Sequence, residues 1–285
     1  MSKMIKITGV RRDTQYSPNH IENDAAIFNL ASEHLKKHGF EVTEYSEEEF
    51  LNTPVTGDFI YTMARDTRTV EKLQALENEG KKVINSGYGI NNCRREKMTR
   101  LLIAHHIPYP KTIIVQTNDP SSVDLSSLGS DCWIKRGDFH AIQRDDVVYA
   151  RVGTETDSLI REYALRNISS IVINEHLEGD LVKFYGVSGT DFFHWFYPCS
   201  CQHTKYGLEA INGKITGIPF DVNRLKEICN QVAQVLNIRI YGGDCVIGQD
   251  GRIRIIDFND WPSFAPCREE AAPFIAECIA SFCLL

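Results

Sequence analysis

The sequence contains no long apolar segment. No run of about 18 apolar residues, the length that spans a bilayer, occurs in the chain. The N-terminus enters a strand-like pattern at once, in residues 4–10, and no apolar segment typical of a signal peptide precedes it. We therefore expect no membrane partner and a cytoplasmic location.

A basic excess is missing as well. The chain has 31 Lys and Arg residues against 38 Asp and Glu residues, which gives a formal net charge of −7. A protein that binds nucleic acid through phosphate contacts needs a surplus of Lys and Arg. The balance argues against a nucleic-acid partner, although it allows a local basic site for a phosphate-containing ligand.

The nine cysteines show none of the paired spacings that are typical of zinc sites. Their number is odd, and a single residue separates Cys199 from Cys201. We interpret the cysteines as reduced thiols of a cytosolic protein. A catalytic role for Cys199 or Cys201 is the less favoured alternative.

Internal repeats and low-complexity tracts are also absent, and the first 85 residues instead alternate between strands and helices. The apolar patterns predict strands at 4–10, 40–45, 59–63 and 82–85, and helices at 22–37 and 69–79. This alternation predicts a parallel sheet covered by helices, with ligands beyond the carboxyl ends of its strands. Four arginines at these ends are either anchors for a substrate carboxylate or solvated loop charges: Arg11, Arg12, Arg65 and Arg68.

The remaining chain consists of shorter strands and three further helices. Strands are predicted at 111–115, 132–135, 171–174 and 181–187, and helices at 94–106, 156–165 and 222–236. Segments 192–197 and 214–218 bracket a loop. Two hairpins are predicted, one in 141–151 around Asp145-Asp146 and one in 243–257 around Gln249-Asp250-Gly251.

The second of these hairpins carries the strongest chemical signal. Asp244 opens one strand, and Asp257 and Asn259 close the other, on either side of Phe258. Alternate residues of a strand point to the same face, so Asp257 and Asn259 project together and the hairpin brings Asp244 beside them. Two carboxylates and an amide oxygen suit Mg²⁺ that also contacts phosphates. The alternative is a polar strand exit without a ligand.

Two weaker signals accompany it. Lys135 ends an apolar strand, where its amine can reach phosphate oxygens, although a surface lysine at a strand end gives the same pattern. Residues 174–179, Asn-Glu-His-Leu-Glu-Gly, follow another strand, and their backbone can contact an adenine edge while side chains hold a ribose. The alternative for this segment is a plain loop.

The order of these pieces resembles the ATP-grasp superfamily, in particular D-alanine–D-alanine ligases and RimK-like glutamate ligases. The pieces stand in this order along the chain: Lys97 in Arg-Arg-Glu-Lys-Met-Thr-Arg, Ile107-Pro-Tyr-Pro110, Ile134-Lys135, Glu175-His-Leu-Glu-Gly179, Asp244, and Ile256-Asp-Phe-Asn-Asp-Trp-Pro262. No single motif is as specific as a Walker loop, and the ordered set carries the resemblance.

The resemblance implies an α/β (α+β) fold in three parts. A parallel-sheet domain before the ATP-grasp unit would occupy residues 1–93. Two subdomains with largely antiparallel sheets would follow at 94–175 and 176–285, the second with the metal site. ATP and Mg²⁺ would be required, with Mn²⁺ as an alternative metal.

The resemblance also implies roles for individual residues. Lys97 and Lys135 would contact ATP phosphates. Glu175, His176 and Leu177 would hold the adenine, Glu178 or Asp180 would lie near the ribose, and Lys183 would point into the cleft. Lys205 would reach the γ-phosphate from a mobile loop at 199–213. The metal ligands would be Asp244, Asp257 and Asn259.

Some positions depart from the pattern. The family usually has Glu where this chain has Asp257, and D-alanine ligases have Arg two residues before the first metal ligand, where this chain has Gly242. A cation that stabilises an oxyanion would have to come from elsewhere, with Arg268, Arg254 and Arg239 as candidates. His140, in the loop after Lys135, is either a ligand of phosphate or substrate or a residue without a role.

The function implied is an ATP- and Mg²⁺-dependent ligase that joins a small carboxylate or amino acid to an amine, or to a thiol, through an acylphosphate. An ATP-grasp kinase that phosphorylates a hydroxyl is one alternative, and a non-catalytic ATP-binding regulator is another. The expected partners are small-molecule carboxylate and amine substrates, and a homodimer is the default assembly.

Overall fold

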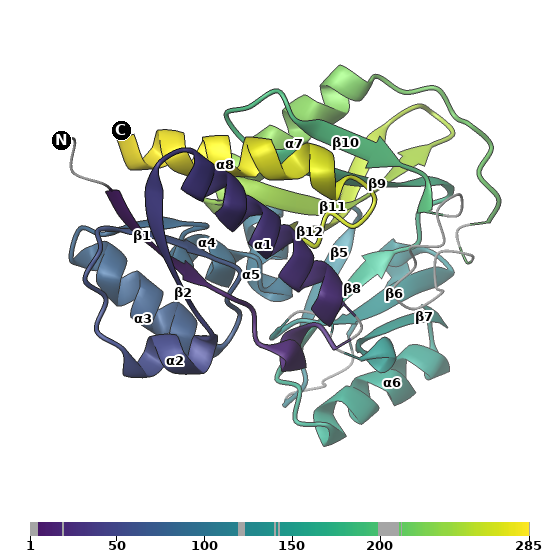
Figure 1. The fold of residues 1–285 in the computed structure, drawn as a ribbon. Coiled ribbons are helices and arrows are strands. Elements are labelled where there is room, and N and C mark those ends of the chain that lie inside the picture. The colour runs from purple at the N-terminus through teal and green to yellow at the C-terminus, as the bar shows by residue number, and fades with distance from the viewer. Residues whose placement is uncertain are drawn as a thin grey trace.

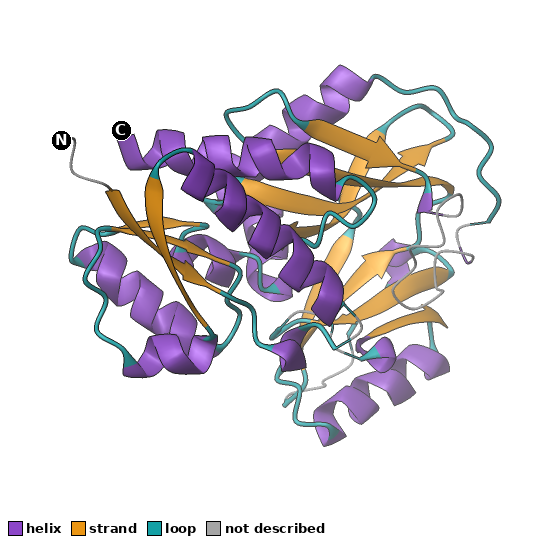
Figure 2. Cartoon of the chain, viewed as in Figure 1, coloured by secondary structure: helices purple, strands orange, loops and turns teal. Residues whose placement is uncertain are grey.

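The computed structural model describes residues 5–18, 20–118, 123–139, 141, 143–198, 211 and 213–284. Its strands form three four-stranded sheets (Figures 1 and 2). No helix in these ranges has the length and apolar character needed to cross a membrane.

The first sheet is parallel, as the alternation of strands and helices predicts. It has the order β2-β1-β3-β4, from β1 (Ile5–Val10), β2 (Phe40–Tyr45), β3 (Phe59–Thr62) and β4 (Lys82–Ile84). Helices α2 (Glu47–Asn52), α3 (Thr67–Asn78) and α4 (Gly87–Asn92) follow strands β2, β3 and β4 in the chain. Residues of all three helices share a hydrophobic core with β1, β3 and β4.

The other face of this sheet is covered from both ends of the chain. Helix α1 (Ile21–Lys37) packs beside α8 (Arg268–Leu284), the purple and yellow helices of Figure 1. Their apolar side chains, among them Phe28 and Ile275, share one core with Ile7, Tyr61 and Trp261. The N-terminal sheet therefore depends on the C-terminal helix for its burial.

The second sheet is antiparallel, with the order β5-β8-β6-β7, from β5 (Thr112–Gln116), β6 (Asp131–Arg136), β7 (Val147–Arg151) and β8 (Ser170–Glu175). Helix α6 (Thr154–Leu165) packs against it through Ile160 and Tyr163. Helix α5 (Arg95–Ala104) contacts both this sheet, at β8, and α7 (Val222–Leu236).

The third sheet is also antiparallel. It has the order β10-β9-β11-β12, from β9 (Gly179–Val187), β10 (Phe193–Phe196), β11 (Ile240–Gly248) and β12 (Ile253–Asp260). Helix α7 covers one face, where Leu225 and Val232 share a core with Val182, Phe184 and Ile247. Since side chains alternate along a strand, the neighbours of these residues point to the opposite face, which is the face that carries the site.

The α7 boundaries match the prediction because both ends are fixed locally. Asp221 accepts hydrogen bonds from the backbone of Asn223 and Arg224, and Asn237 ends the helix in a left-handed conformation with φ of 58°. Three helices are not predicted by the sequence patterns: α2, α4 and α8.

The predicted hairpin in residues 141–151 is wrong. Residues 144–146 form a short 3₁₀ turn, and β7 pairs with β6 rather than with the residues before the turn. The Asp145-Asp146 pair is held by Arg166, whose guanidinium donates to the Asp145 carbonyl at 2.9 Å and to the Asp146 carboxylate at 2.5 Å. A contact from the end of α6 thus decides this segment, and a local turn signal cannot report it.

Candidate functional site

Three adjacent strands of the third sheet place charged side chains side by side. Lys183 on β9 is the register partner of Asp244 on β11, which in turn is the partner of Asp257 on β12. Lys183 Nζ lies 3.1 Å from Asp244 Oδ1. All three residues line the cavity described below. The predicted approach of Asp244 to Asp257 is confirmed, because the hairpin pairs them directly.

Asn259 also lines this cavity, two residues beyond Asp257 on the same face of β12. The pairing register of β11 and β12 shifts between Asp244 and Cys245. Among the described residues, no group of three or more His, Cys, Asp or Glu side chains could hold a metal. The available set is two carboxylates and an amide, and these hard oxygen donors fit Mg²⁺ that completes its shell with phosphate oxygens and water.

Lys135 reaches the same region from the second sheet. It lies near the end of β6, is only 7% exposed, and its Nζ donates to the Ile256 carbonyl at 3.1 Å. Burial lowers the Lys135 pKa to about 8, with a further decrease from Arg95 that is opposed by Asp257 and Asp244. Lys135 therefore joins the two antiparallel sheets across the cavity, next to the two carboxylates.

Arg95 is a site residue that the sequence patterns miss. It is the first residue of α5, and its two terminal nitrogens contact the two carboxylate oxygens of Asp257 at 3.2 and 3.4 Å. The nearby Asp257 raises the Arg95 pKa against the lowering effect of burial, which is the larger single cause. Arg95 is 4% exposed and lines the cavity.

The structure places Lys97 outside the cavity lining. Lys97 is exposed on α5, whereas Arg95, Met98, Thr99 and Leu102 form its buried face. A helix turns by about 100° per residue, so a residue two positions after Arg95 points to a different side. The cation that α5 supplies to the cavity is Arg95.

The second and third sheets together supply an apolar end of the cavity. Trp133, Leu177, Leu181 and Val246 line it, together with Glu175 at the end of β8. The Glu175 carboxylate accepts a hydrogen bond from the Lys111 backbone at 2.8 Å. An apolar slot suits a flat heteroaromatic base; Glu175 and Leu177 line it, and their contact with an adenine stays a prediction.

His176 lies beside this end rather than in its lining. Its Nδ1 accepts a hydrogen bond from Trp133 Nε1 at 3.1 Å, and Tyr149 packs edge-on against both rings. His176 therefore holds Trp133, which does line the cavity. A role in binding through its own side chain stays a prediction, while its contact with Trp133 is direct.

The structure does not bring Asp180 into the cavity lining, and its predicted place near a ribose is not supported by this position. The carboxylate of Asp180 accepts hydrogen bonds from the backbones of Thr216 and Ile218, both at 2.8 Å, and these bonds lower its pKa against the raising effect of burial. On β9, Leu181, Lys183 and Tyr185 line the cavity, so Asp180 points to the other face. Its function is to fix the segment before α7.

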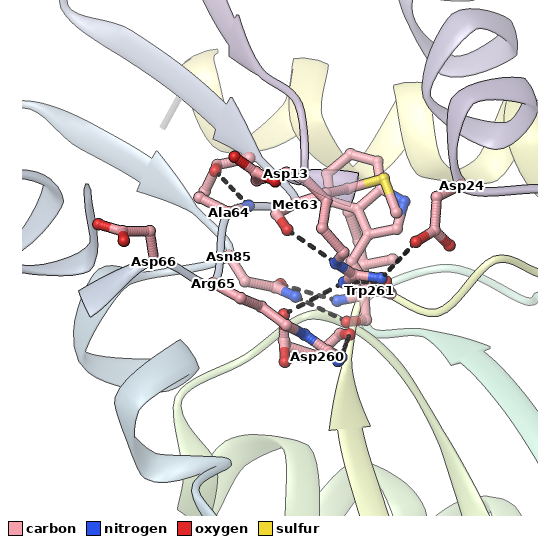
Figure 3. A network of polar contacts seen from close by, with 12 residues as sticks. Asp13, Asp24, Met63, Ala64, Arg65, Asp66, Asn85, Asp260 and Trp261 are labelled. Carbon is pink, nitrogen blue, oxygen red and sulfur yellow. Dashed lines mark hydrogen bonds and ion pairs between the residues drawn. The ribbon is translucent and has the colours of Figure 1, made fainter. Parts of the chain in front are cut away.

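Two of the four N-terminal arginines reach the cavity, Arg12 and Arg65. Figure 3 shows Arg65 extended from the end of β3 to Asp260 on β12, near Asp24 and Trp261. Arg11 instead pairs with Glu44, and Arg68 is exposed and lies 3.7 Å from Asp66. The carboxyl ends of the parallel strands thus face Asp244 and Asp257 of the third sheet, the two carboxylates that are predicted to bind a metal.

The remaining candidate cations lie elsewhere. Arg268 donates to Asn23 Oδ1 at 2.6 Å and does not itself line the cavity. Arg254 pairs with Asp250 at the hairpin turn, and Arg239 stacks on Phe282. Lys205 and His140 lie outside the described residues, as does most of the loop 199–213.

The cavity that the lining residues surround has a volume of about 310 Å³. One end is apolar and belongs to the second and third sheets, and the other is polar and belongs to α1, the N-terminal sheet and the segment after β12. Arg95, Lys135, Lys183, Asp244 and Asp257 lie among its lining residues.

Searches with the sequence find no matching family model and no matching curated protein. Solved structures do match. A D-alanine–D-alanine ligase from Bacillus anthracis, complexed with ATP, superposes with a TM-score of 0.68 at 16% identity, over 99% of this chain and 98% of that chain.

A RimK domain ATP-grasp protein from Sphaerobacter thermophilus gives a TM-score of 0.66 at 15% identity, over 96% of this chain and 99% of that one. The ATP-grasp ligase PsnB with its minimal precursor gives 0.63 at 16% identity, over 98% and 100%. The chain has the ATP-grasp fold. The predicted fold class and the resemblance to ATP-grasp proteins are confirmed at this level, while the boundaries at 93/94 and 175/176 stay predictions.

Proposed function

We propose that this ATP-grasp protein is an ATP- and Mg²⁺-dependent ligase that joins a small carboxylate, or an amino acid, to an amine through an acylphosphate. The observation that carries the proposal is the set of Arg95, Lys135 and Lys183 around Asp244 and Asp257 in one cavity. Such a set neutralises a transferring phosphoryl group, which requires positioning and charge rather than a nucleophilic side chain.

The proposed chemistry has two steps. A carboxylate oxygen bonds to the γ-phosphorus while the bond to the ADP oxygen breaks, and ADP leaves with the electron pair. The amine nitrogen then attacks the carbonyl carbon, phosphate leaves with the carbon–oxygen electron pair, and one proton is released. Asp244, Asp257 and Asn259 would hold Mg²⁺, which when bound supplies positive charge beside the phosphates.

The residues of the chain have separate tasks in this proposal. Lys135 and Arg95 bind phosphate oxygens from the second sheet and α5. Lys183 holds Asp244, and Arg95 holds Asp257, so both carboxylates are oriented before a ligand arrives. The apolar end with Glu175, Leu177 and Trp133 binds the adenine. Mg²⁺ or Mn²⁺ as the metal, the cytoplasmic location and the homodimer stay predictions.

The proposal is tested by ADP release from ATP and Mg²⁺ in the presence of pooled amino acids and small carboxylates. We expect release that depends on an added carboxylate and that Asp257→Asn abolishes. Asp250→Asn, in the turn of the same hairpin and outside the cavity lining, is the matched control and should retain activity.

Hydroxylamine separates the reaction classes. An acylphosphate is trapped as a hydroxamate, so a ligase forms hydroxamate in step with ADP. ADP release without hydroxamate would indicate a kinase that phosphorylates a hydroxyl. Tight ATP binding without any release in the pools would favour a nucleotide-binding regulator, and absence of ATP binding would refute the proposal.

A further inference from the structure

The polar end of the cavity contains an arginine that is buried but only weakly held. Arg65 follows β3 at the carboxyl edge of the N-terminal sheet, is 8% exposed, and lines the cavity. Its contacts within the described part of the chain run through Nη2, which lies 3.4 Å from both the carbonyl and the Oδ1 of Asp260. Its Nε is buried there without a hydrogen-bond partner.

The neighbouring Arg12 differs in this respect. Its Nε donates to the Met63 carbonyl at 3.1 Å, Nη1 to Asp24 at 3.0 Å, and Nη2 to the Trp261 carbonyl at 2.9 Å. Three short contacts from three different segments fix Arg12 as a structural tie between the N-terminal sheet and the segment after β12. Arg65 is the arginine of this pair with donor capacity left for a ligand.

The backbone of Arg65 is held in place independently of its side chain. The carboxylate of Glu47 accepts hydrogen bonds from the backbone nitrogens of Arg65 and Asp66, at 3.1 and 2.8 Å, and from that of Asp13 at 2.9 Å. The loops after β1 and β3 are thus joined before any ligand binds. A guanidinium on a fixed backbone, with an Nε that has no hydrogen-bond partner among the described residues, suits a preorganised anion site.

The electrostatics of this end point the same way. Burial and the adjacent Arg12 lower the Arg65 pKa, and Asp260 and Asp24 only partly oppose them. The other four cations of the cavity already have closer partners: Arg12 contacts Asp24, Arg95 contacts Asp257, Lys183 contacts Asp244, and Lys135 contacts the Ile256 carbonyl. An anion beside Arg65 would therefore add to the partial compensation that Asp260 and Asp24 give this charge.

We propose that Arg65 binds the substrate's carboxylate, through the oxygen that is not phosphorylated, and holds it toward the γ-phosphate. This inference rests on the proposed ligase function. Arg65 lines the same cavity as Asp257 and Asn259, the residues predicted to bind the metal. The same oxygen carries negative charge again when the amine attacks, so one residue serves both steps.

The test compares Arg65→Gln with Arg65→Lys, and uses Arg68→Gln as the exposed control in the same segment. With the carboxylate that drives ADP release, we expect kcat/KM of Arg65→Gln to fall by at least about 30-fold, the loss expected for a buried charge-assisted hydrogen bond. The ATP dissociation constant should change by less than about 3-fold, and added guanidinium should restore part of the activity.

Arg65→Lys keeps a charge beside Asp260 and should retain more activity than Arg65→Gln, with a raised KM for the carboxylate. Arg65→Lys is also the variant to measure if Arg65→Gln does not fold. Activity of folded Arg65→Gln within about 3-fold of the wild type, an unchanged KM for the carboxylate in Arg65→Lys, or an equal loss of ATP affinity would overturn the inference.

A binding experiment separates this inference from the proposed function. If no carboxylate drives ADP release, the ligase proposal fails, and methylphosphonate is titrated into the protein that holds a non-hydrolysable ATP analogue and Mg²⁺. Binding that weakens by at least about 10-fold in Arg65→Gln supports an anion site at Arg65. Equal binding in both proteins, or no binding to the wild type, overturns it.

Discussion

Burial decides which single residues of the cavity can act as cations. Lys135 is almost fully buried, and its pKa of about 8 leaves the ammonium form dominant at neutral pH but not above pH 8. Arg95 and Arg65 are buried too, yet guanidinium keeps its charge at all accessible pH values. The three cations therefore respond differently to pH, although they share one cavity.

This difference predicts a pH-dependent ATP affinity. The unfolded chain binds the Lys135 proton up to its usual pKa of 10.5, and the folded protein only up to about 8, so removing this charge does not destabilise the fold at neutral pH. We expect Lys135→Met to lower ATP affinity by about 10- to 100-fold at neutral pH. Calorimetry should show that raising the pH from about 7 to about 9 weakens ATP binding by the wild type but not by the variant.

Lys111→Met provides the control, because Lys111 precedes β5 and is exposed. It should bind ATP like the wild type at both pH values. A wild-type affinity that is unchanged at high pH would show that the Lys135 charge does not contribute to ATP binding.

A second residue-scale prediction concerns Asn85, after β4. Its Nδ2 donates to the Ile240 carbonyl at 2.7 Å, and its Oδ1 accepts from the backbones of Arg239 and Ile240 at 2.8 and 3.0 Å. Asn85→Ala leaves these buried groups unpaired. We expect a loss of about 2–4 kcal/mol in the free energy of unfolding, measured by urea denaturation.

The exposed Asn78 accepts a hydrogen bond from Tyr88 and is the comparison. Asn78→Ala should change stability by no more than about 0.5 kcal/mol. Similar effects of the two substitutions would mean that the contact between Asn85 and β11 adds no stability.

At the scale of elements, the rotation of a helix selects the site residue. Arg95 and Lys97 are two cations in one turn of α5, and only Arg95 points to the buried side, where it meets Asp257. The strands apply the same rule with a period of two, since Lys183 and Tyr185 face the cavity and Asp180 faces away. The position of a charged residue along its helix or strand, rather than its type, therefore decides whether it reaches the cavity.

The two α5 cations form a matched pair for mutation. Arg95→Met should weaken ATP binding by at least about 10-fold, because it removes a buried charge beside Asp257. Lys97→Met should stay within about 2-fold of the wild type, because Lys97 is exposed. Fluorescence titration with an ATP analogue measures both. A larger loss for Lys97→Met would return the phosphate contact to that residue and contradict the placement of α5.

At the scale of the whole molecule, the chain's two ends share one core. Phe28 of α1, Ile7 of β1 and Ile275 of α8 belong to the same buried cluster, with Trp261 after β12. Arg12 adds a polar tie through the Trp261 carbonyl. The predicted N-terminal domain, residues 1–93, therefore has its own sheet, but residues from the end of the chain cover one apolar face of that sheet.

This arrangement predicts that residues 1–93 do not fold alone. Without α8 and Trp261, one face of the parallel sheet and the apolar stripe of α1 lose their cover, and such exposed apolar surface promotes aggregation. We expect the fragment to lack a cooperative thermal transition by circular dichroism, whereas the full chain should show one. A fragment that melts cooperatively would establish an independent domain and refute the shared-core interpretation.

Most of the strands and helices of this protein, and the carboxylates and lysines of its cavity, can be predicted from the sequence alone. Local patterns predict the parallel sheet and α7, since periodicity and caps are properties of neighbouring residues, whereas the antiparallel sheets were implied by the resemblance to ATP-grasp proteins. The hairpin likewise predicts Asp244 beside Asp257, because a tight turn fixes which residues are opposite each other. The order of the motifs along the chain was enough to indicate a resemblance to ATP-grasp proteins.

Only the tertiary structure decided which charges meet. Arg95 reaches Asp257 across 162 positions, and Arg65 reaches Asp260 across 195. No local pattern encodes such contacts, because they depend on how α5 and the N-terminal sheet pack on the third sheet. The same holds for the orientation of Asp180, the turn at Asp145-Asp146 and the covering of β1 by α8. Local sequence decides whether a segment forms a helix or a strand, and packing decides which face of that element lines the cavity.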